Sequence, residues 1–190
     1  MEEVQHTLAY VFWHWKQSDV AVEAYEQRQQ AFHTALVANP APGFRGSFSS
    51  ALTGMPWAAA GGEAYEDWYL VDSFAALGEL NQAAVSAQRS APHDAAAAIA
   101  ADGSGGLYRL RLGSVGAPPH CAHWFSKPPG VSYQALLATL APFVENNHAQ
   151  LWMRQMVLGP GQEFCLHAQL PLELPADVQV FVVPLRPVWP

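Results

Sequence analysis

Short segments of strand-like residues separate longer segments in which apolar residues recur at helical spacing. Residues 8–15 (LAYVFWHW) are rich in aromatic and β-branched residues, which favours a strand. A stripe of apolar residues follows Ser18-Asp19 and ends at Asn39-Pro40, which is typical of a helix. By the same criteria the first half contains strands at 8–15, 44–52 and 65–72, helices at 18–38 and 73–85, and a turn-rich segment at 53–62.

The second half follows a similar order with more irregular pieces. We expect a short helix at 94–101 and then a linker that closes in GSGG. HCAHWFSK, between two Pro-Pro pairs, is predicted to be irregular or extended. A strand at 107–113 either closes the first unit or opens the second. The remaining elements are a helix at 131–144, a hairpin of strands 150–158 and 163–169 around GPGQ, and a final strand at 178–185. Pro184 indicates that this last strand is an edge or contains a bulge.

The two halves share a pattern. In each, a tyrosine opens a helix, a breaker follows, and a strand then ends at a glycine turn. We therefore divide the chain into a first unit at 1–105 and a second at 106–190. The segment PLELPAD leaves no room for a full second helix in the second unit.

A doubled β-α-β-β-α-β order with strands such as YVFWHW and YEDWYLV resembles the ferredoxin-like dimeric α/β-barrel superfamily. That superfamily includes proteins of the antibiotic-biosynthesis monooxygenase type and, in tandem form, chlorite dismutase and its haem-handling relatives. The resemblance implies an α+β fold in which tandem ferredoxin-like repeats form an α/β barrel from antiparallel sheets. It also implies helices on one sheet face and a ligand cavity where the other face meets a second sheet. Function must come from that cavity, because the fold hosts many activities.

Composition adds an expectation about assembly and partners. Charged residues make up only 13% of the 190 residues, about half the usual share. A surface this poor in charge favours a homo-oligomer. The net charge is −7 and no basic cluster occurs, which argues against nucleic acid and anionic membranes as partners.

The cellular setting is expected to be the cytoplasm. Cys121 and Cys165 are too few for a disulfide scaffold and are expected to be reduced thiols. The N-terminal MEEVQHT is acidic and lacks the apolar core of a signal peptide. No apolar run approaches the roughly 18 residues that a membrane-spanning helix needs.

His14 is the first candidate for chemistry. It shares a strand face with Tyr10 and Phe12 near the end of the first strand, where a side chain can meet the mouth of a cavity. It could carry protons beside an aromatic ligand that the two rings help to bind. The alternative is a structural histidine whose hydrogen bonds are satisfied inside the protein.

Asp67 is the candidate partner of His14. It alternates with Trp68 and shares a face with Tyr69, so a buried Asp67 could accept a hydrogen bond from a phenol or from His14. A carboxylate beside an imidazole fixes its tautomer, which makes this pair the candidate acid–base couple. Asp67 could equally lie on the surface. Tyr69 and Trp68 are candidate ligand contacts.

The second half offers a candidate anion site. Arg109 and Arg111 share one face of a strand, and Arg154 shares a face with Trp152. If the three arginines converge, they could hold a carboxylate or phosphate, and the resemblance implies haem propionates as one such group. His167 on the neighbouring hairpin strand is a further candidate ligand contact. The alternative is a solvated strand face or ordinary salt bridges.

Several other classes of site find little support. His120 and His123 flank Cys121, but no further ligands stand nearby at metal-site spacing, so we predict no metal. GSGG does not join a strand to a helix as a phosphate-binding loop would, and no G-x-S-x-G motif occurs. We predict no cofactor, because the helix expected at 131–144 holds no histidine for haem, and His148 follows it.

Three hypotheses about function remain open. The first is a small-molecule-binding barrel, with the possibility of a cofactor-independent monooxygenase, in which His14 and the tryptophans hold an aromatic or apolar ligand. The second is a haem protein of the chlorite-dismutase type. The third is a non-catalytic module that serves self-association.

Overall fold

Strands and helices alternate along the described residues, 7–57 and 63–190, of this computed structural model. The first half contains β1 (Leu8–Lys16), α1 (Val22–Ala38), β2 (Phe44–Leu52), β3 (Ala64–Val71), α2 (Phe74–Ala84), the short 3-10 helix η1 (Ala87–Arg89), α3 (Ser90–Ala97) and β4 (Ala100–Leu112). The second contains β5 (Cys121–Phe125), α4 (Tyr133–Asn146), β6 (Gln150–Met156), β7 (Phe164–Ala168) and β8 (Val180–Trp189). The expected N-terminal segment MEEVQHT and the turn at 53–62 lie partly outside the described residues.

The strands close into one antiparallel barrel in the order β1-β3-β2-β8-β5-β7-β6-β4. The order β4-β1-β3-β2 of the first half recurs as β8-β5-β7-β6 in the second. Pairing of β2 with β8 and of β4 with β6 joins the two halves. The α+β barrel predicted from the sequence is therefore confirmed, whereas the division into units at 1–105 and 106–190 stays a prediction.

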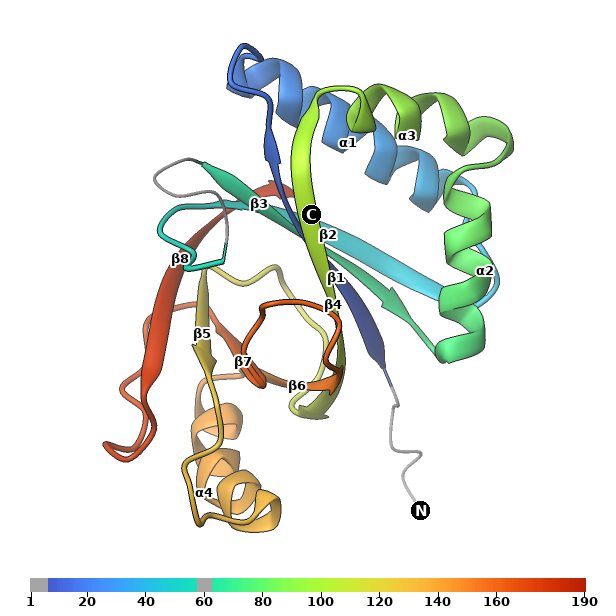
Figure 1. Ribbon diagram of the computed structural model, residues 1–190. Helices are drawn as coiled ribbons and strands as arrows, with labels where there is room; N and C mark the ends of the chain where they lie inside the picture. The colour runs from blue at the N-terminus through green and yellow to red at the C-terminus, as the bar shows by residue number, and fades with distance from the viewer. Residues whose placement is uncertain (1–6, 58–62) are drawn as a thin grey trace.

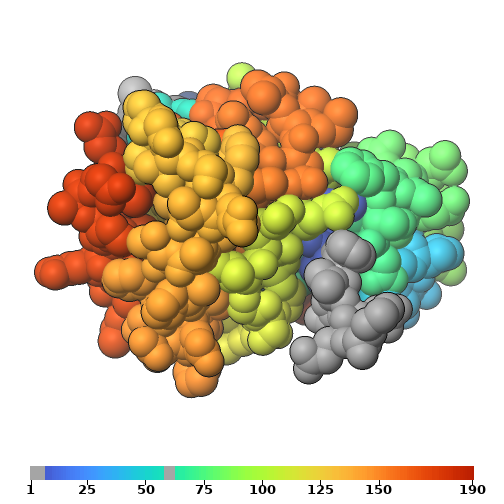
Figure 2. Space-filling model, turned by 90° about the horizontal axis from the view of Figure 1, so that it is seen from below, coloured from blue at the N-terminus to red at the C-terminus, as the bar shows by residue number. Residues whose placement is uncertain are grey.

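The helices cover the outside of this barrel. Figure 1 shows α1, α2 and α3 together over the sheet of the first half, and α4 beside the second half. Apolar residues of α1 and α2 pack on β1 and β3, and those of α4 pack on β5, β6 and β7. In the view of Figure 2, the second half (yellow to red) and α2 (green) occupy opposite sides of the molecule.

The inside of the barrel is a packed aromatic core. Trp13 and Trp124 have ring centroids 5.6 Å apart, and those of Trp68 and Trp152 are 5.2 Å apart. All four side chains are fully buried. Small barrels usually fill their interior with side chains in this way. The ligand cavity expected between the two sheets is therefore replaced by core.

Two segments that the sequence left irregular are strands. The GSGG predicted to be a linker lies inside β4, where Gly103, Gly105 and Gly106 pair with β1. Residues 121–125 of HCAHWFSK form β5, which pairs with both β7 and β8. Glycine is a weak strand former and proline pairs suggest loops, so local propensity hid both strands.

The last strand changes partners at its proline. β8 pairs with β5 from Val180 to Pro184, and with β2 from Leu185 to Trp189. Each part of β8 therefore has a paired strand on one side only. Pro184 stands where the partner changes, and its missing N–H interrupts neither pairing. The segment between β7 and β8 contains no helix. Among the described helices, none has the length and apolar content needed to cross a membrane.

Candidate functional site

A cavity of about 670 Å³ lies between the outer face of the first-half sheet and the helices α1–α3. Tyr10, Phe12 and His14 of β1 and Asp67 and Tyr69 of β3 form its sheet side. The volume is within the range typical of small-molecule sites. The cavity thus lies on the helical face of the sheet, opposite to the face on which it was expected.

The cavity wall is mainly apolar and has an apolar rim. Phe74 and Val85 of α2 and its C-cap, and Leu158 from the β6–β7 loop, belong to the lining and are at least half exposed, so the cavity opens to solvent beside them. No lysine or arginine of the described chain belongs to the lining. Such a wall favours an apolar ligand that has no strongly anionic group.

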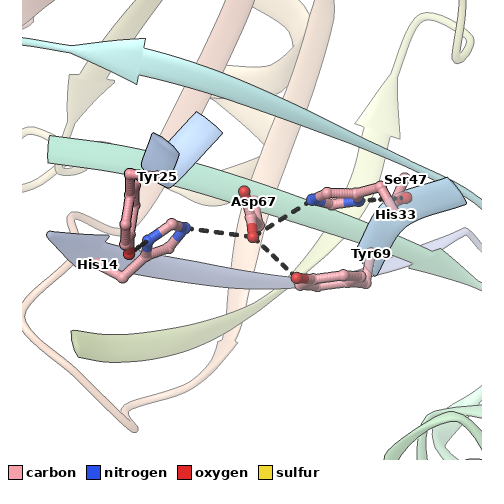
Figure 3. A network of polar contacts seen from close by, with 6 residues as sticks. All are labelled: His14, Tyr25, His33, Ser47, Asp67 and Tyr69. Carbon is pink, nitrogen blue, oxygen red and sulfur yellow. Dashed lines mark hydrogen bonds and ion pairs between the residues drawn. The ribbon is translucent and has the colours of Figure 1, made fainter. Parts of the chain in front are cut away.

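Three side chains contact one buried carboxylate, that of Asp67, at this wall (Figure 3). Tyr69 donates a hydrogen bond of 2.8 Å from its hydroxyl to Asp67 Oδ2. The Nε2 atoms of His14 and His33 lie 3.2 and 3.3 Å from the same oxygen. Asp67, His14 and His33 are at most 1% exposed. The predicted contacts of Asp67 with His14 and with a phenol are therefore present.

The other ring nitrogen of each histidine contacts a hydroxyl group. His14 Nδ1 lies 2.6 Å from the Tyr25 hydroxyl, and His33 Nδ1 lies 2.7 Å from Ser47 Oγ. Tyr25 belongs to the cavity lining, but Ser47 and His33 do not. Asp67, His14 and Tyr25 therefore all line the cavity, whereas the arm through His33 and Ser47 lies outside the lining and supports Asp67 from behind.

The local fold explains why these side chains meet. Phe12 pairs with Asp67 and His14 pairs with Tyr65 across β1 and β3. Paired residues point to the same face of a sheet, so all four side chains point toward α1. Tyr25 and His33 stand eight positions apart on α1, about two turns, and therefore share one face. The sequence analysis assigned neither Tyr25 nor His33 to the site, although their spacing on one predicted helix was a usable signal.

The electrostatics keep Asp67 ionised. Burial acts to raise the pKa of Asp67, but attraction to His14 and His33, with their hydrogen bonds, holds this pKa well below its usual value. Burial and the charge of Asp67 raise the pKa of both Tyr25 and Tyr69. Both phenols are therefore protonated at neutral pH and can donate hydrogen bonds.

The candidate arginine site is not formed. Tyr108, whose side chain belongs to the barrel core, pairs with Arg154, so Arg154 faces the barrel interior and donates a 2.5 Å hydrogen bond to the Gly161 carbonyl. Arg109 and Arg111 alternate with Tyr108 and so stand on the outer face of β4, where Arg111 is exposed. The three arginines do not converge, because the pairing register puts them on different faces.

Three other expected ligand contacts also lie away from the main cavity. Trp68 and Trp152 are part of the barrel core. His167 also points into the barrel, where its Nε2 lies 3.6 Å from Glu66 Oε1. It lines a second cavity of about 200 Å³ that also includes Gln150. The sequence did not single out Glu66, because a glutamate in a strand gives no signal of burial.

The lining does not fit haem. It offers no arginine or lysine for the propionates, and of its two histidines His14 contacts protein groups through both ring nitrogens while His93 contacts Asp94 through Nδ1. Over residues 7–57 and 63–190 no three His, Cys, Asp or Glu side chains gather as a metal site requires. Cys121 and Cys165 are buried and free.

No protein-family profile matches the sequence, and no curated protein matches it. Solved structures do resemble the fold. A provisionally assigned monooxygenase from Fusobacterium nucleatum is 7% identical with a TM-score of 0.69, and the match covers 98% of this chain and 94% of that one. A provisionally assigned chlorite dismutase is 11% identical with a TM-score of 0.54, covering 96% of each chain. An anthrone oxidase-like protein is 10% identical with a TM-score of 0.52, covering 98% and 94%.

These similarities identify the architecture. The chain shares its fold, a closed antiparallel barrel with helices outside, with these three proteins, as the order of its predicted elements indicated. At such low identity the likeness concerns the fold, and the chemistry must be argued from the residues of the cavity.

Proposed function

We propose that the protein binds a small, mainly apolar aromatic molecule in the cavity under α1–α3 and removes a proton from its phenolic or enolic hydroxyl. The observation that supports this most is the buried Asp67–His14–Tyr25 arm at the wall of an otherwise apolar cavity. Polar groups that converge in an apolar pocket orient a ligand and select its chemistry.

The geometry suggests how the proton moves. When His14 Nε2–H faces Asp67, His14 Nδ1 accepts the hydrogen bond of the Tyr25 hydroxyl. The substrate hydroxyl then gives its proton to the Tyr25 oxygen while Tyr25 passes its own proton to Nδ1. Tyr25 begins and ends neutral, which its raised pKa requires. The imidazolium that forms lies beside the ionised Asp67, which stabilises it.

Within this proposal, the anion that remains can react with molecular oxygen. An enolate of an anthrone-like compound can give electrons to O2, and two of the similar structures are named a monooxygenase and an anthrone oxidase-like protein. The balanced reaction converts anthrone and one O2 into anthraquinone and one water. One oxygen atom becomes the new carbonyl, and the other leaves as water with the two hydrogens of the oxidised carbon.

Oxygen uptake with anthrone tests this function. The wild-type protein should accelerate uptake and form anthraquinone, and Tyr25→Phe should lower the rate by about 10²–10⁴-fold because the relay loses its hydroxyl. Ser47→Ala is the matched control, since it removes the equivalent hydroxyl from the His33 arm outside the cavity. Equal losses in both variants, or no uptake above buffer, would contradict the proposed chemistry.

A further inference from the structure

Two glycines of β4 stand beneath the aromatic wall of the cavity. Gly103 and Gly105 share the β4 face of Leu107, which lines the cavity, whereas Tyr108 faces the barrel core. Their neighbours across the ladder are His14 and Phe12, respectively. The two glycines therefore occupy the helical face of the sheet, directly beside the proposed substrate site.

Aromatic rings of β1 lie over these glycines. A Cβ atom on Gly105 would stand 2.7 Å from Tyr10 Oη, and one on Gly103 would stand 2.7 Å from Phe12 Cε2. Real side chains essentially never approach this closely. Each ring thus leans diagonally across the ladder into the space that the missing side chain leaves free.

The leaning rings belong to one continuous row. Tyr10 stacks between Tyr69 and Phe12, with centroid distances of 6.1 and 6.3 Å. Phe12 in turn stacks on His14 at 5.2 Å, with 19° between the ring planes. A ring that rises from the β4 surface must enter the cavity, and it disturbs the row that ends at His14.

We propose that Gly105, together with Gly103, determines which ligands the cavity accepts by letting Tyr10 and Phe12 lie flat against β4. The role rests on the proposed function, since it concerns the shape of the same site. Flattened rings leave width for a fused, planar ligand. A side chain at either position would narrow the cavity and favour a single-ring ligand. The glycines are specificity-determining residues that do not touch the reacting atoms.

Gly105 offers the cleaner test. The three nearest neighbours of its added Cβ are all atoms of the Tyr10 side chain, whereas a Cβ on Gly103 also meets the Trp13 carbonyl oxygen at 2.9 Å. Gly105→Ala therefore requires the Tyr10 ring to move. Gly116→Ala is the control, because nothing lies within 4 Å of its added Cβ. Tyr10→Ala with and without Gly105→Ala completes a double-mutant cycle.

The probes are anthrone, with three fused rings, and phenol, with one ring, in calorimetric binding titrations. Gly105→Ala should weaken anthrone binding by about tenfold or more and phenol binding much less, and Gly116→Ala should change neither. In the Tyr10→Ala background, Gly105→Ala should lose its effect on anthrone. If Gly105→Ala alone does not fold, Tyr10→Ala with and without Gly105→Ala still shows whether the glycine acts through the Tyr10 ring.

The outcomes separate the two proposals. If the wild type binds neither probe, the proposed function fails and this inference fails with it. If the wild type binds anthrone but Gly105→Ala binds it equally well, only the role of the glycine is overturned. The same holds if Gly105→Ala weakens anthrone by the same factor with and without the Tyr10 ring, because the ring would then not mediate the effect.

Discussion

A single oxygen atom, Asp67 Oδ2, organises the site at the scale of residues. Side chains from β1, β3 and α1 contact this oxygen. Two of them are histidines, and each histidine contacts a hydroxyl group through its other ring nitrogen. The arms are chemically similar but differ in place, because His14 and Tyr25 line the cavity and His33 and Ser47 do not. This difference lets matched variants separate a role in chemistry from a role in support.

His14→Ala should lower both stability and ligand binding. At the rim position that the sequence suggested, the replacement would cost no more than about 1 kcal/mol. The side chain is instead 1% exposed, and its removal takes a partner from the buried Tyr25 hydroxyl and one of three partners from Asp67, which keeps Tyr69 and His33. We expect a loss of roughly 1–3 kcal/mol in the free energy of unfolding, measured by denaturant titration.

Binding of a phenolic ligand to His14→Ala should fall as well, measured on protein that is still folded at low temperature. A variant that loses stability but binds the ligand as well as the wild type would show that His14 serves the fold alone. The sequence left these two roles open as alternatives, whereas the buried geometry makes them compatible.

At the scale of elements, β5 and the segment before β8 depend on one histidine tautomer. His123 is fully buried, its Nδ1–H donates to the Leu166 carbonyl at 3.1 Å, and its Nε2 accepts from the Leu172 amide at 2.8 Å. An imidazolium has no lone pair to accept that second bond. Burial, together with the nearby His167, lowers the pKa of His123, so the neutral form is favoured in the folded state.

Acid should therefore weaken this contact. A base whose pKa is lowered by folding contributes its full stability above the unfolded pKa of about 6.5, and loses it as the pH falls toward the folded pKa. We expect hydrogen exchange of the Leu172 amide to become less protected over that interval. His123→Gln keeps an acceptor but does not titrate, so its protection should not show this fall. The same pH dependence in both proteins would contradict the assignment.

Sequence patterns predicted the elements unevenly, for a physical reason. The strand at 8–15 was evident because its residues favour strands by themselves. The glycine stretch of β4 has no such preference, and its place in the sheet depends on rings from β1 that cover it. Contacts between distant segments decide such elements, and a local pattern does not contain them.

At the scale of the whole molecule, the barrel could be predicted but the place of its cavity could not. Alternation sorted the β1 residues correctly, with Tyr10, Phe12 and His14 on one side and Trp13 on the other. Because both sides are apolar, the pattern could not tell which face packs into a core and which faces a cavity. The tryptophans were assigned to the ligand for this reason, and the structure places Trp13, Trp68 and Trp152 in the core.

Self-association stays a prediction, and the structure narrows its route. Because the barrel closes within one chain, it leaves a second copy only short strand sides without a ladder, such as those of β8. The broader route is contact through exposed apolar side chains, such as Met156 at the end of β6 and Val157 and Leu158 after it. We expect sedimentation velocity to show an oligomer at tens of micromolar. A monomer throughout that range would remove the prediction.

The purified protein should also show no intense Soret band. The cavity lacks cationic side chains for haem propionates, and His14 is engaged on both nitrogens. A Soret band that disappears in His14→Gln would contradict this account of the cavity.

The most direct test of the central claim is the visible spectrum of bound 4-nitrophenol, whose phenolate is yellow and whose phenol is colourless. Below the solution pKa of this probe, a site that takes the ligand's proton through Tyr25 and His14 should bind it as the phenolate. We predict that the wild type develops the phenolate band on saturation, that Ser47→Ala does so as well, and that Tyr25→Phe does not. A probe that binds without the band, or a band of equal strength in Tyr25→Phe, would contradict the proposed relay.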